Sequence, residues 1–324
     1  MQEKSISGRK IVILGTGGTI AGTAARKGDN IGYTAAQVGV GQLADAIPGL
    51  GDSGPLLMEQ VAQLDSKDMS FEAWARLAAR VSHHLAQDDV EGVVITHGTD
   101  TLEETAFFLH ALLSPAKPVV LTCAMRPASA LAPDGPQNML DSAAVARTKG
   151  AAGVLVVCAG TIHLATDVQK THTYALDAFS SRDAGPLGYV EEGEVRLLRA
   201  WPSGSAQDTR GAPGRLLALE AAAAWPHVEI VTSHAGANGA IVGLLQAAGV
   251  QGIVVAATGN GTVHHSLESA LLQAQKEGVA VLRATRCANG RILAKTGDLV
   301  EDAGGLTPVK ARVLLLLRLM GCAE

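Results

Sequence analysis

The sequence predicts an α/β fold of two domains, each a three-layer αβα arrangement built on a mainly parallel sheet. Short apolar runs without polar alternation, such as residues 11–14, indicate strands that are buried on both faces. These runs alternate with segments of helical periodicity, the order expected of parallel strands joined by crossover helices. The composition agrees, because 47% of the residues are hydrophobic but only 3% are aromatic, so small and branched aliphatic side chains form the core.

The first half of the chain follows this order element by element. Apolar runs predict strands at 11–14, 56–64, 92–95, 118–122 and 154–157. The segments between them predict helices at 37–47, from Ser70 or Asp68 through 85, at 101–112 and at about 136–148. The letters TLEE at 101–104 have the pattern of a capping box, so we expect them to begin the third of these helices.

The second half resumes the alternation after an irregular region at 189–226. Residues 201–214 are rich in Pro, Gly and Ser, as linkers are. We therefore expect an N-terminal catalytic domain with a mobile active-site loop at 1–200, a linker at 201–220 and a C-terminal α/β domain at 221–324. In the second domain the pattern predicts strands at 228–232, 252–256 and 279–283, and helices at 240–247, 266–276 and 307–319.

Charge and cysteine usage exclude several classes of protein. The formal net charge is -5 and lysines and arginines do not cluster, so the basic stripe that nucleic-acid binding needs is missing. Apolar stretches are too short or too broken for a signal peptide or a membrane span, and we expect a cytoplasmic protein without membrane contact. The cysteines are too widely spaced for a disulfide framework or a zinc site, and we expect all of them to be buried: Cys123, Cys158, Cys287 and Cys322.

The glycine-rich loop at 15–22 follows the first strand, where α/β sheets bind their ligands. A dinucleotide fingerprint would need Gly where Ile20 stands, and a phosphate-binding P-loop would need Lys where Thr23 stands. Both nucleotide interpretations are therefore disfavoured. The loop leaves Thr19 sterically accessible as a candidate nucleophile, and the Gly-rich segment after it has the composition of a lid.

Later strand-end loops carry groups that could activate a hydroxyl. Thr99 and Asp100 lie at a predicted helix N-terminus, and Lys170 lies in a polar loop after a later strand. Such a Thr, Lys and Asp could form a proton relay, because a desolvated ammonium close to the hydroxyl eases removal of its proton. Each residue also has a simpler role. Asp100 could cap the helix, and Lys170 could be a solvated charge.

The histidines do not indicate a metal centre. His97 is flanked by strand and loop residues, and we expect it to orient the loop through hydrogen bonds rather than act as a base. The pairs at 83–84 and 264–265 would point in different directions on a helix, so they make poor chelates. We expect neither a metal ion nor an organic cofactor.

Several ordered motifs identify a family. GTGGTIAG at 15–22 and ITHGTDTLEET at 95–105 resemble the two signature motifs of the bacterial-type L-asparaginases, which hydrolyse asparagine, and often glutamine, to the acid and ammonia. The resemblance covers nearly the whole chain. Its further motifs are LDSKDM at 64–69, CAMRPASALAPDGPQN at 123–138, DVQKTHT at 167–173, AGPLGY at 184–189, ATGNG at 257–261 and LTPVKARVLLLL at 306–317.

The resemblance implies a division of catalytic work between two threonines. Thr19 would be acylated by the substrate, with Tyr33 in the mobile loop as its activator. Thr99, Asp100 and Lys170 would form a second relay, which the residue types had already grouped. Which of the two hydroxyls attacks first, and which later serves water, stays open at the level of sequence.

The same resemblance implies how a small amino-acid substrate is bound. Ser66 would bind its α-carboxylate and Asp100 its α-ammonium, while the backbone at Thr99 and Ala124 lies close to the reacting amide. Asp65 and Lys67 flank this serine and belong to the same substrate-binding turn. Family members pair tightly as dimers and commonly form tetramers, and Asn260 would support the site from the neighbouring subunit.

The sequence also departs from the family pattern. Lys67 stands where Gln is common in extracytoplasmic members, Gly32 precedes the tyrosine where Asn is frequent, and Glu301 does not align clearly with an acidic residue that relatives place in the partner's site. Two other functions are compatible with the motifs. One is a subunit of a tRNA-dependent amidotransferase, which carries an extra N-terminal domain. The other is a catalytically silent amino-acid-binding or regulatory module.

Overall fold

The computed structural model describes residues 8–26, 28–202, 206–222 and 224–323, with backbone only at 206–211. The chain divides into two compact units, Met1–Pro213 and Gly214–Glu324. Each unit contains its own sheet and its own helices, and each is α/β, which confirms the predicted fold class. The domain limits drawn from the sequence stay a prediction.

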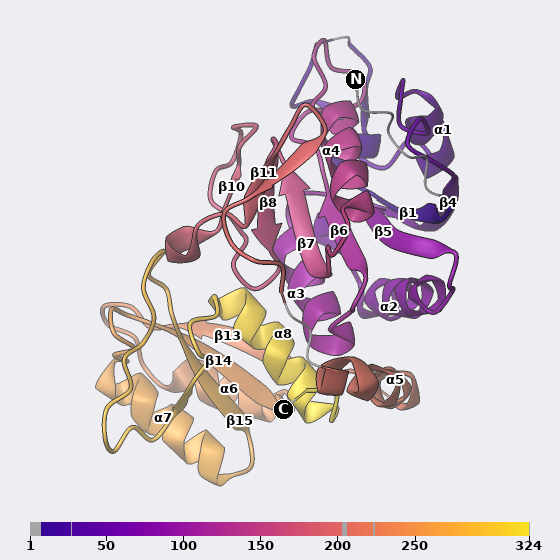
Figure 1. Cartoon of the computed structure of the whole chain (residues 1–324). Coiled ribbons are helices and arrows are strands. Elements are labelled where there is room, and N and C mark those ends of the chain that lie inside the picture. Colours follow the sequence, from indigo (N-terminus) through magenta and orange to yellow (C-terminus); the bar gives the residue numbers. More distant parts are fainter. Residues whose placement is uncertain (1–7, 27, 203–205, 223, 324) are drawn as a thin grey trace. The chain divides into compact units, whose positions relative to one another are not determined.

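The first unit contains an eight-stranded sheet in the order β12-β11-β8-β7-β6-β5-β1-β4 (Figure 1). From β4 to β7 neighbouring strands are parallel, and from β7 to β12 they are antiparallel. The parallel strands are β4 (Leu56–Leu64), β1 (Lys10–Gly17), β5 (Val90–Thr96), β6 (Pro118–Thr122) and β7 (Gly153–Cys158). The antiparallel strands are β8 (Thr161–Leu164), β11 (Gly188–Glu191) and β12 (Glu194–Leu197).

Strand β1 is buried along nearly its whole length because it is hydrogen-bonded to β4 on one side and β5 on the other. Its apolar run, residues 11–14, is at most 1% exposed. The register with β4 shifts between Gly15 and Gly17, where the strand passes into the glycine loop. The strand is thus longer than the apolar run that predicted it, because glycines and a threonine continue the ladder.

Helices cover both faces of this sheet. Helices α1 (Val40–Asp45) and α4 (Gly135–Arg147) share a core with alternate residues of the central strands. Helices α2 (Phe71–Leu85) and α3 (Leu102–Leu113) contact the sheet strands as well, and Trp74 of α2 stacks on Phe108 of α3 with ring centroids 4.8 Å apart. Ser70 caps α2 by accepting from the Ala73 N–H.

The predicted capping box at 101–104 is wrong. Thr101 occupies the N-cap position of α3, but its side chain makes no cap hydrogen bond. Its hydroxyl instead donates to the carbonyl of Ser66, 2.8 Å away. A hydrogen bond between two loops has replaced a local one, which a four-residue pattern cannot reveal.

The antiparallel side of the sheet was not predicted from the sequence. Its outer strands are four residues long and carry charged residues, Glu191 in β11 and Glu194 and Arg196 in β12, so they lack the apolar runs that mark the buried strands. Two small ribbons accompany the sheet: β2 (Thr23–Ala24) with β3 (Tyr33–Thr34), and β9 (Gln169–Lys170) with β10 (Phe179–Ser180). Both ribbons carry candidate site residues.

The second unit contains a parallel four-stranded sheet in the order β13-β14-β15-β16. Helices α6 and α7 pack on one side, and α8 contacts β13, β14 and β15. The strands are β13 (Val228–Thr232), β14 (Gly252–Ala257), β15 (Ala280–Thr285) and β16 (Glu301–Asp302), and the helices are α6 (Ala240–Ala247), α7 (His265–Lys276) and α8 (Pro308–Leu319). Most of the stretch 201–220, predicted as a linker, is helical, because helix α5 (Ala206–Ala221) begins within it and continues past Pro213.

The cysteines follow the prediction with one exception. Cys123, Cys158 and Cys322 are buried, but Cys287 is exposed in the loop after β15, so that part of the prediction is wrong. The sulfurs of Cys123 and Cys158 lie 3.0 Å apart, and burial raises the pKa of the Cys123 thiol well above its ordinary value. Among the described residues, no helix has the length and apolar character needed to cross a membrane.

Candidate active site

Four neighbouring parallel strands deliver the candidate loops to one edge of the sheet. In the order β4-β1-β5-β6, each strand is followed by a loop with a candidate residue. Gly15 of β1 pairs with Thr96 of β5, which pairs with Thr122 of β6, so the strands end level with one another. Parallel strands share one carboxyl edge, so the four loops that follow these strands, including those that carry Thr19 and Ala124, all begin at that edge.

Two glycines allow these loops to touch through their backbones. A Cβ on Gly18, which has φ of 80°, would overlap the Cα of Gly98. A Cβ on Gly98 would in turn overlap the hydroxyl of Ser66. The glycines therefore provide room for contact between three loops, rather than room for a phosphate.

Thr19 and Tyr33 are hydrogen-bonded to each other. Thr19 begins the short helix η1 (Thr19–Ala21) and is 7% exposed, and its Oγ1 lies 2.7 Å from the phenolic oxygen of Tyr33. The tyrosine is held by the β2–β3 ribbon and packs over Gly22, where a Cβ would lie 2.8 Å from the ring. The pairing shows that these two predicted residues lie together.

The turn before Tyr33 explains the glycine at position 32. The Asp29 carboxylate accepts hydrogen bonds from the N–H groups of Ile31 and Gly32, and the bond from Gly32 is the largest cause of a lowered pKa of Asp29. A Cβ at position 32 would lie 2.6 Å from that carboxylate. Glycine here is therefore suited to a carboxylate-capped turn.

Lys170 bridges Thr99 and Asp100. Its ammonium donates to the Thr99 hydroxyl at 2.8 Å and to the Asp100 carboxylate at 2.6 Å. Thr99 is buried, while the Asp100 side chain is 53% exposed and can meet a solute. The backbone N–H of Lys170 donates to Glu103 on α3, which holds the ribbon against the helix. The grouping of these residues that chemistry suggested is thus present as a set of contacts.

Ser66 is tied to the same loop. It is 2% exposed, and its hydroxyl oxygen accepts from the Asp100 N–H at 3.2 Å, which leaves the hydroxyl hydrogen available to an anion. Asp65 begins the helix η2 (Ser66–Asp68) and pairs with the ammonium of Lys67. The hydrogen bond that Lys67 donates to Asp65, more than the one that it donates to Asp68, raises the pKa of Lys67. Lys67 is therefore neutralised by carboxylates of its own turn.

Asn260, a predicted site residue, and Glu301 fall outside these contacts. Asn260 belongs to the second unit, where its side chain donates to the Leu293 carbonyl and accepts from the Leu293 N–H. Glu301 lies on β16 and pairs with Arg318 at 2.8 Å. The role predicted for Asn260 concerns a second chain.

His97 orients the loop, as predicted. Its Nδ1 lies 2.7 Å from the carbonyl of Gly98 and its Nε2 lies 3.0 Å from the hydroxyl of Thr105, which also accepts from the indole of Trp74. Complete burial lowers the pKa of His97 to about 4. The imidazole is therefore neutral at pH 7, and it links the loop to the packed core.

Sequence reasoning missed Asp134 and Asn138, which hold the loop that contains Ala124. Asp134 accepts from the N–H groups of Met125 and Arg126, each at 2.9 Å. Both residues occur in the quoted motif at 123–138. The sequence predicted only a helix from about residue 136 in this region.

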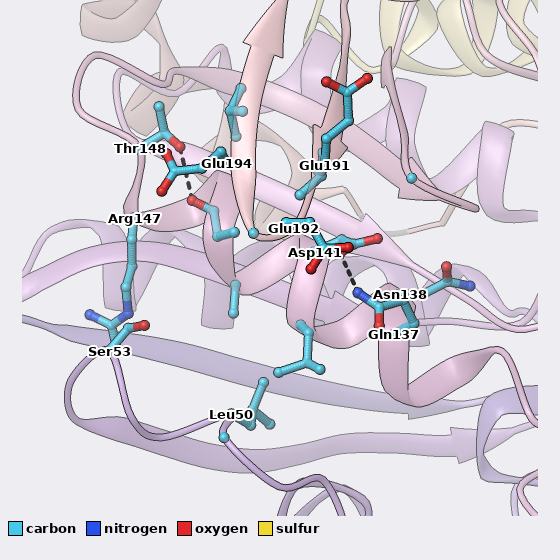
Figure 2. A pocket seen from close by; sticks show the side chains of 18 of the residues that line it. Leu50, Ser53, Gln137, Asn138, Asp141, Arg147, Thr148, Glu191, Glu192 and Glu194 are labelled. Atoms are coloured by element: carbon cyan, nitrogen blue, oxygen red, sulfur yellow. Dashed lines mark hydrogen bonds between the residues drawn. The ribbon is translucent and has the colours of Figure 1, made fainter. Parts of the chain in front are cut away.

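A cavity of about 1380 Å³ lies along α4 and the turn between β11 and β12. Figure 2 shows Asp141, Gln137 and Asn138 of α4 in its wall, together with Glu191, Glu192 and Glu194. Burial raises the pKa of Asp141, whose carboxylate accepts from the Gln137 amide at 2.8 Å. None of the predicted site residues lines this cavity, although Asp134 and Asn138 do.

Hydroxyl side chains at one edge of an α/β sheet thus contact a phenol and an ammonium, an arrangement typical of an enzyme active site. Residues 10–203 match the family described as "Asparaginase, N-terminal", and residues 227–321 match the "Glutaminase/Asparaginase C-terminal domain". The chain therefore belongs to the asparaginase family, and it is an amidohydrolase.

Named relatives agree over almost the full length. L-asparaginase 2 of Escherichia coli strain K12 is 40% identical over 95% of this chain and 88% of the relative. The glutaminase-asparaginase of Pseudomonas fluorescens biotype A is 35% identical over 95% and 86%. The crystal structure of the probable cytoplasmic L-asparaginase from Campylobacter jejuni superposes with a TM-score of 0.88 at 37% identity, and the match covers 96% of this chain and 95% of that one.

Proposed function

We propose that the protein is an L-asparaginase that hydrolyses L-asparagine to L-aspartate and ammonia through a threonine acyl-enzyme, with L-glutamine as a side substrate. The observation that carries the proposal is the contact set at one sheet edge. Thr19 meets Tyr33 at 2.7 Å, and Lys170 meets Thr99 at 2.8 Å. The names of the relatives supply the substrate class.

Substrate binding follows from the charges of an amino acid. Its α-ammonium needs an anion, which the half-exposed carboxylate of Asp100 provides. Its α-carboxylate needs donors, and the free hydroxyl hydrogen of Ser66 is one. Asp65 and Lys67 complete this turn, and the backbone at Thr99 and Ala124 faces the reacting amide.

Acylation begins when the Thr19 hydroxyl oxygen attacks the carboxamide carbon. Tyr33, within hydrogen-bond distance, accepts the threonine proton as the C–O bond forms and in the same step passes its own phenolic proton towards the carboxamide nitrogen, which is protonated as the C–N bond breaks. Ammonia leaves, and the aspartyl group remains as an ester on Thr19.

Deacylation repeats the attack with water as the nucleophile. The Thr99 hydroxyl, held by the Lys170 ammonium, accepts a proton from the water while it passes its own proton to the Asp100 carboxylate, 3.5 Å away. As the ester bond to Thr19 breaks, this proton is returned to the threonine oxygen, which restores the hydroxyl and releases aspartate. None of these steps uses a metal ion or an organic cofactor.

The proposal includes a homo-oligomer of at least two chains, in which Asn260 supports the partner's site, and a cytoplasmic location. A relative named as cytoplasmic supports the location, although another relative, from Haemophilus influenzae, is named as periplasmic. Sedimentation of the active protein tests the first point, and a fully active monomer would contradict it. Cell fractionation tests the second.

The deciding experiment is ammonia release by wild type and Thr19→Ala. We expect a loss of at least about a thousandfold in kcat in the variant, with an unchanged circular dichroism spectrum. Full activity of Thr19→Ala would overturn the threonine mechanism. A wild type that binds aspartate but releases no ammonia would instead support the catalytically silent module.

A further inference from the structure

The carbonyl group of Ala124 is buried without a hydrogen-bond partner among the described residues. Ala124 is 1% exposed and follows β6 at the carboxyl edge of the sheet. No described N–H or side chain donates to its oxygen. Because buried carbonyl groups are nearly always paired, this oxygen is suited to accept a hydrogen bond from a ligand.

Asp134 determines the direction in which this oxygen points. The carboxylate accepts from the N–H of Met125 and from the N–H of Arg126. In a trans peptide unit the carbonyl and the N–H point in opposite directions. The Ala124 carbonyl, which shares a peptide unit with the Met125 N–H, is therefore held pointing away from Asp134.

Asn138 holds the preceding peptide unit. Its amide nitrogen donates to the Cys123 carbonyl at 2.9 Å, and its oxygen accepts from the Ala159 N–H at 2.9 Å. The same nitrogen lies 3.4 Å from the Asp134 carboxylate. Both peptide units that include Ala124 are thus held by side chains four residues apart.

Helix α4 supplies a rigid base for both side chains. Asp134 is its N-cap residue but makes no side-chain cap hydrogen bond to it, since the carboxylate is bonded to the loop instead. Met139, Ala143 and Ala146 of the same helix belong to the core beneath the sheet. The packed core therefore sets the orientation of the Ala124 carbonyl.

We propose that Asp134 and Asn138 are positioning residues that hold the Ala124 carbonyl as the acceptor for the carboxamide N–H of the substrate, and so favour an amide over an ester. This inference rests on the proposed function. The hydrogen bond strengthens as the nitrogen is protonated and leaves, because its hydrogens become more positive, and such differential binding lowers the barrier to C–N cleavage. A leaving alkoxide oxygen has no hydrogen to donate before it is protonated.

The experiment compares L-asparagine with L-aspartic acid β-methyl ester, which forms the same acyl-enzyme but releases methanol. In Asp134→Asn the side chain presents one oxygen and one NH2 group, so it cannot accept from both backbone N–H groups. We expect kcat/KM for asparagine to fall about 10- to 100-fold and kcat/KM for the ester to change less than about threefold. The ratio of the two values is the readout that a merely structural role would not move.

Asp141→Asn is the matched control. It makes the same substitution in the same helix at a carboxylate that is bonded to Gln137 and not to the loop. We expect the amide-to-ester ratio of this variant to equal that of wild type. Asp134→Glu is the second variant, since it keeps the charge and both oxygens but displaces them. It is expected to lower the ratio to an intermediate value, and it decides the matter if Asp134→Asn does not fold.

The outcomes separate this inference from the proposed function. Equal losses on both substrates, or an unchanged ratio in Asp134→Asn and Asp134→Glu, overturn the positioning role while leaving the asparaginase assignment intact. A wild type that hydrolyses neither compound overturns the proposed function itself. A ratio that falls equally in Asp141→Asn also overturns the inference, because charge alone would then explain the effect.

Discussion

The two threonines of the site sit in different surroundings. Thr19 is paired with a neutral phenol carried by a two-stranded ribbon of short strands. Thr99 is paired with an ammonium and follows β5, whose loop is tied to the core by the buried His97. The comparison teaches that the two hydroxyls differ in how firmly their partners are held. A local rearrangement of the ribbon can withdraw the phenol from Thr19, whereas the ammonium at Thr99 is fixed in place before any substrate binds.

Removing the ammonium of Lys170 from the second centre, the group formed by Thr99, Asp100 and Lys170, should have the largest effect. In Lys170→Met the Thr99 hydroxyl and the Asp100 carboxylate lose their shared donor, so we expect kcat for asparagine to fall about a thousandfold or more. Steady-state ammonia release measures it. Lys117→Met is the control, because that ammonium donates to the carbonyls of Leu85 and Gln87, away from the candidate site. A Lys170 variant with wild-type kcat would remove the distinction between the centres.

Removing the phenol should have a smaller effect. Tyr33→Phe keeps the ring over Gly22 but deletes the oxygen that meets Thr19, and we expect kcat to fall about a hundredfold, since water can partly replace the hydroxyl. Tyr189→Phe, whose ring lies under Arg196, is the matched control. If Tyr33→Phe lost more activity than Lys170→Met, catalysis would depend more on the pair of Thr19 and Tyr33 than on the group around Lys170.

The pH dependence of stability tests how the second centre is anchored. The folded protein lowers the pKa of His97 from 6.5 to about 4, so the unfolded chain binds the proton more tightly. Stability from this group is therefore present above pH 6.5 and is lost as the pH falls towards 4. Between pH 7 and pH 5 we expect a loss of about 2 kcal/mol.

Urea unfolding of wild type and His97→Gln at several pH values measures this loss. The unfolding free energy of the variant should decline less steeply with falling pH, because the proton that His97 takes up on unfolding no longer contributes. His83→Gln, at an exposed position of α2, should follow the wild-type curve. Parallel curves for wild type and His97→Gln would show that the imidazole does not anchor the loop.

The contact between the loops should give the smallest effect. Gly98→Ala places a Cβ against the Ser66 hydroxyl, and we expect about 1 to 2 kcal/mol of lost unfolding free energy together with weaker binding of aspartate. Gly41→Ala lies in α1 with open space around it, and it should instead stabilise the protein by about 0.5 kcal/mol. Equal effects of the two substitutions would show that the loops do not press on each other.

Much of the fold was predictable because buried parallel strands and their crossover helices leave strong local patterns. Strand β6, which is buried at every residue, and helix α6 have the limits that the sequence predicts. Strand β12 and helix α5 were missed. The first is exposed at three of its four residues, and the second lies in a stretch whose Pro and Gly content is typical of a linker.

The site was predictable where chemistry-bearing residues follow buried strands. Thr99, Asp100 and Lys170 could be grouped by residue type before any contact was known. Asp134 and Asn138 could not, because their role is to bond backbone groups of another loop. A carboxylate or amide that serves a distant N–H or carbonyl leaves no periodic or spacing signal in the chain.

The four thiols differ in exposure, so their rates of chemical labelling can report on local opening of the structure. A maleimide reagent should label Cys287 at once, since it is the exposed thiol among the four cysteines, all of which lie in described parts of the chain. Cys123 and Cys158 adjoin the Ala124 loop and can react only when the ends of β6 and β7 separate. The delay between the labelling of Cys287 and that of Cys123 or Cys158, read by mass spectrometry, therefore reports how often this edge of the sheet opens.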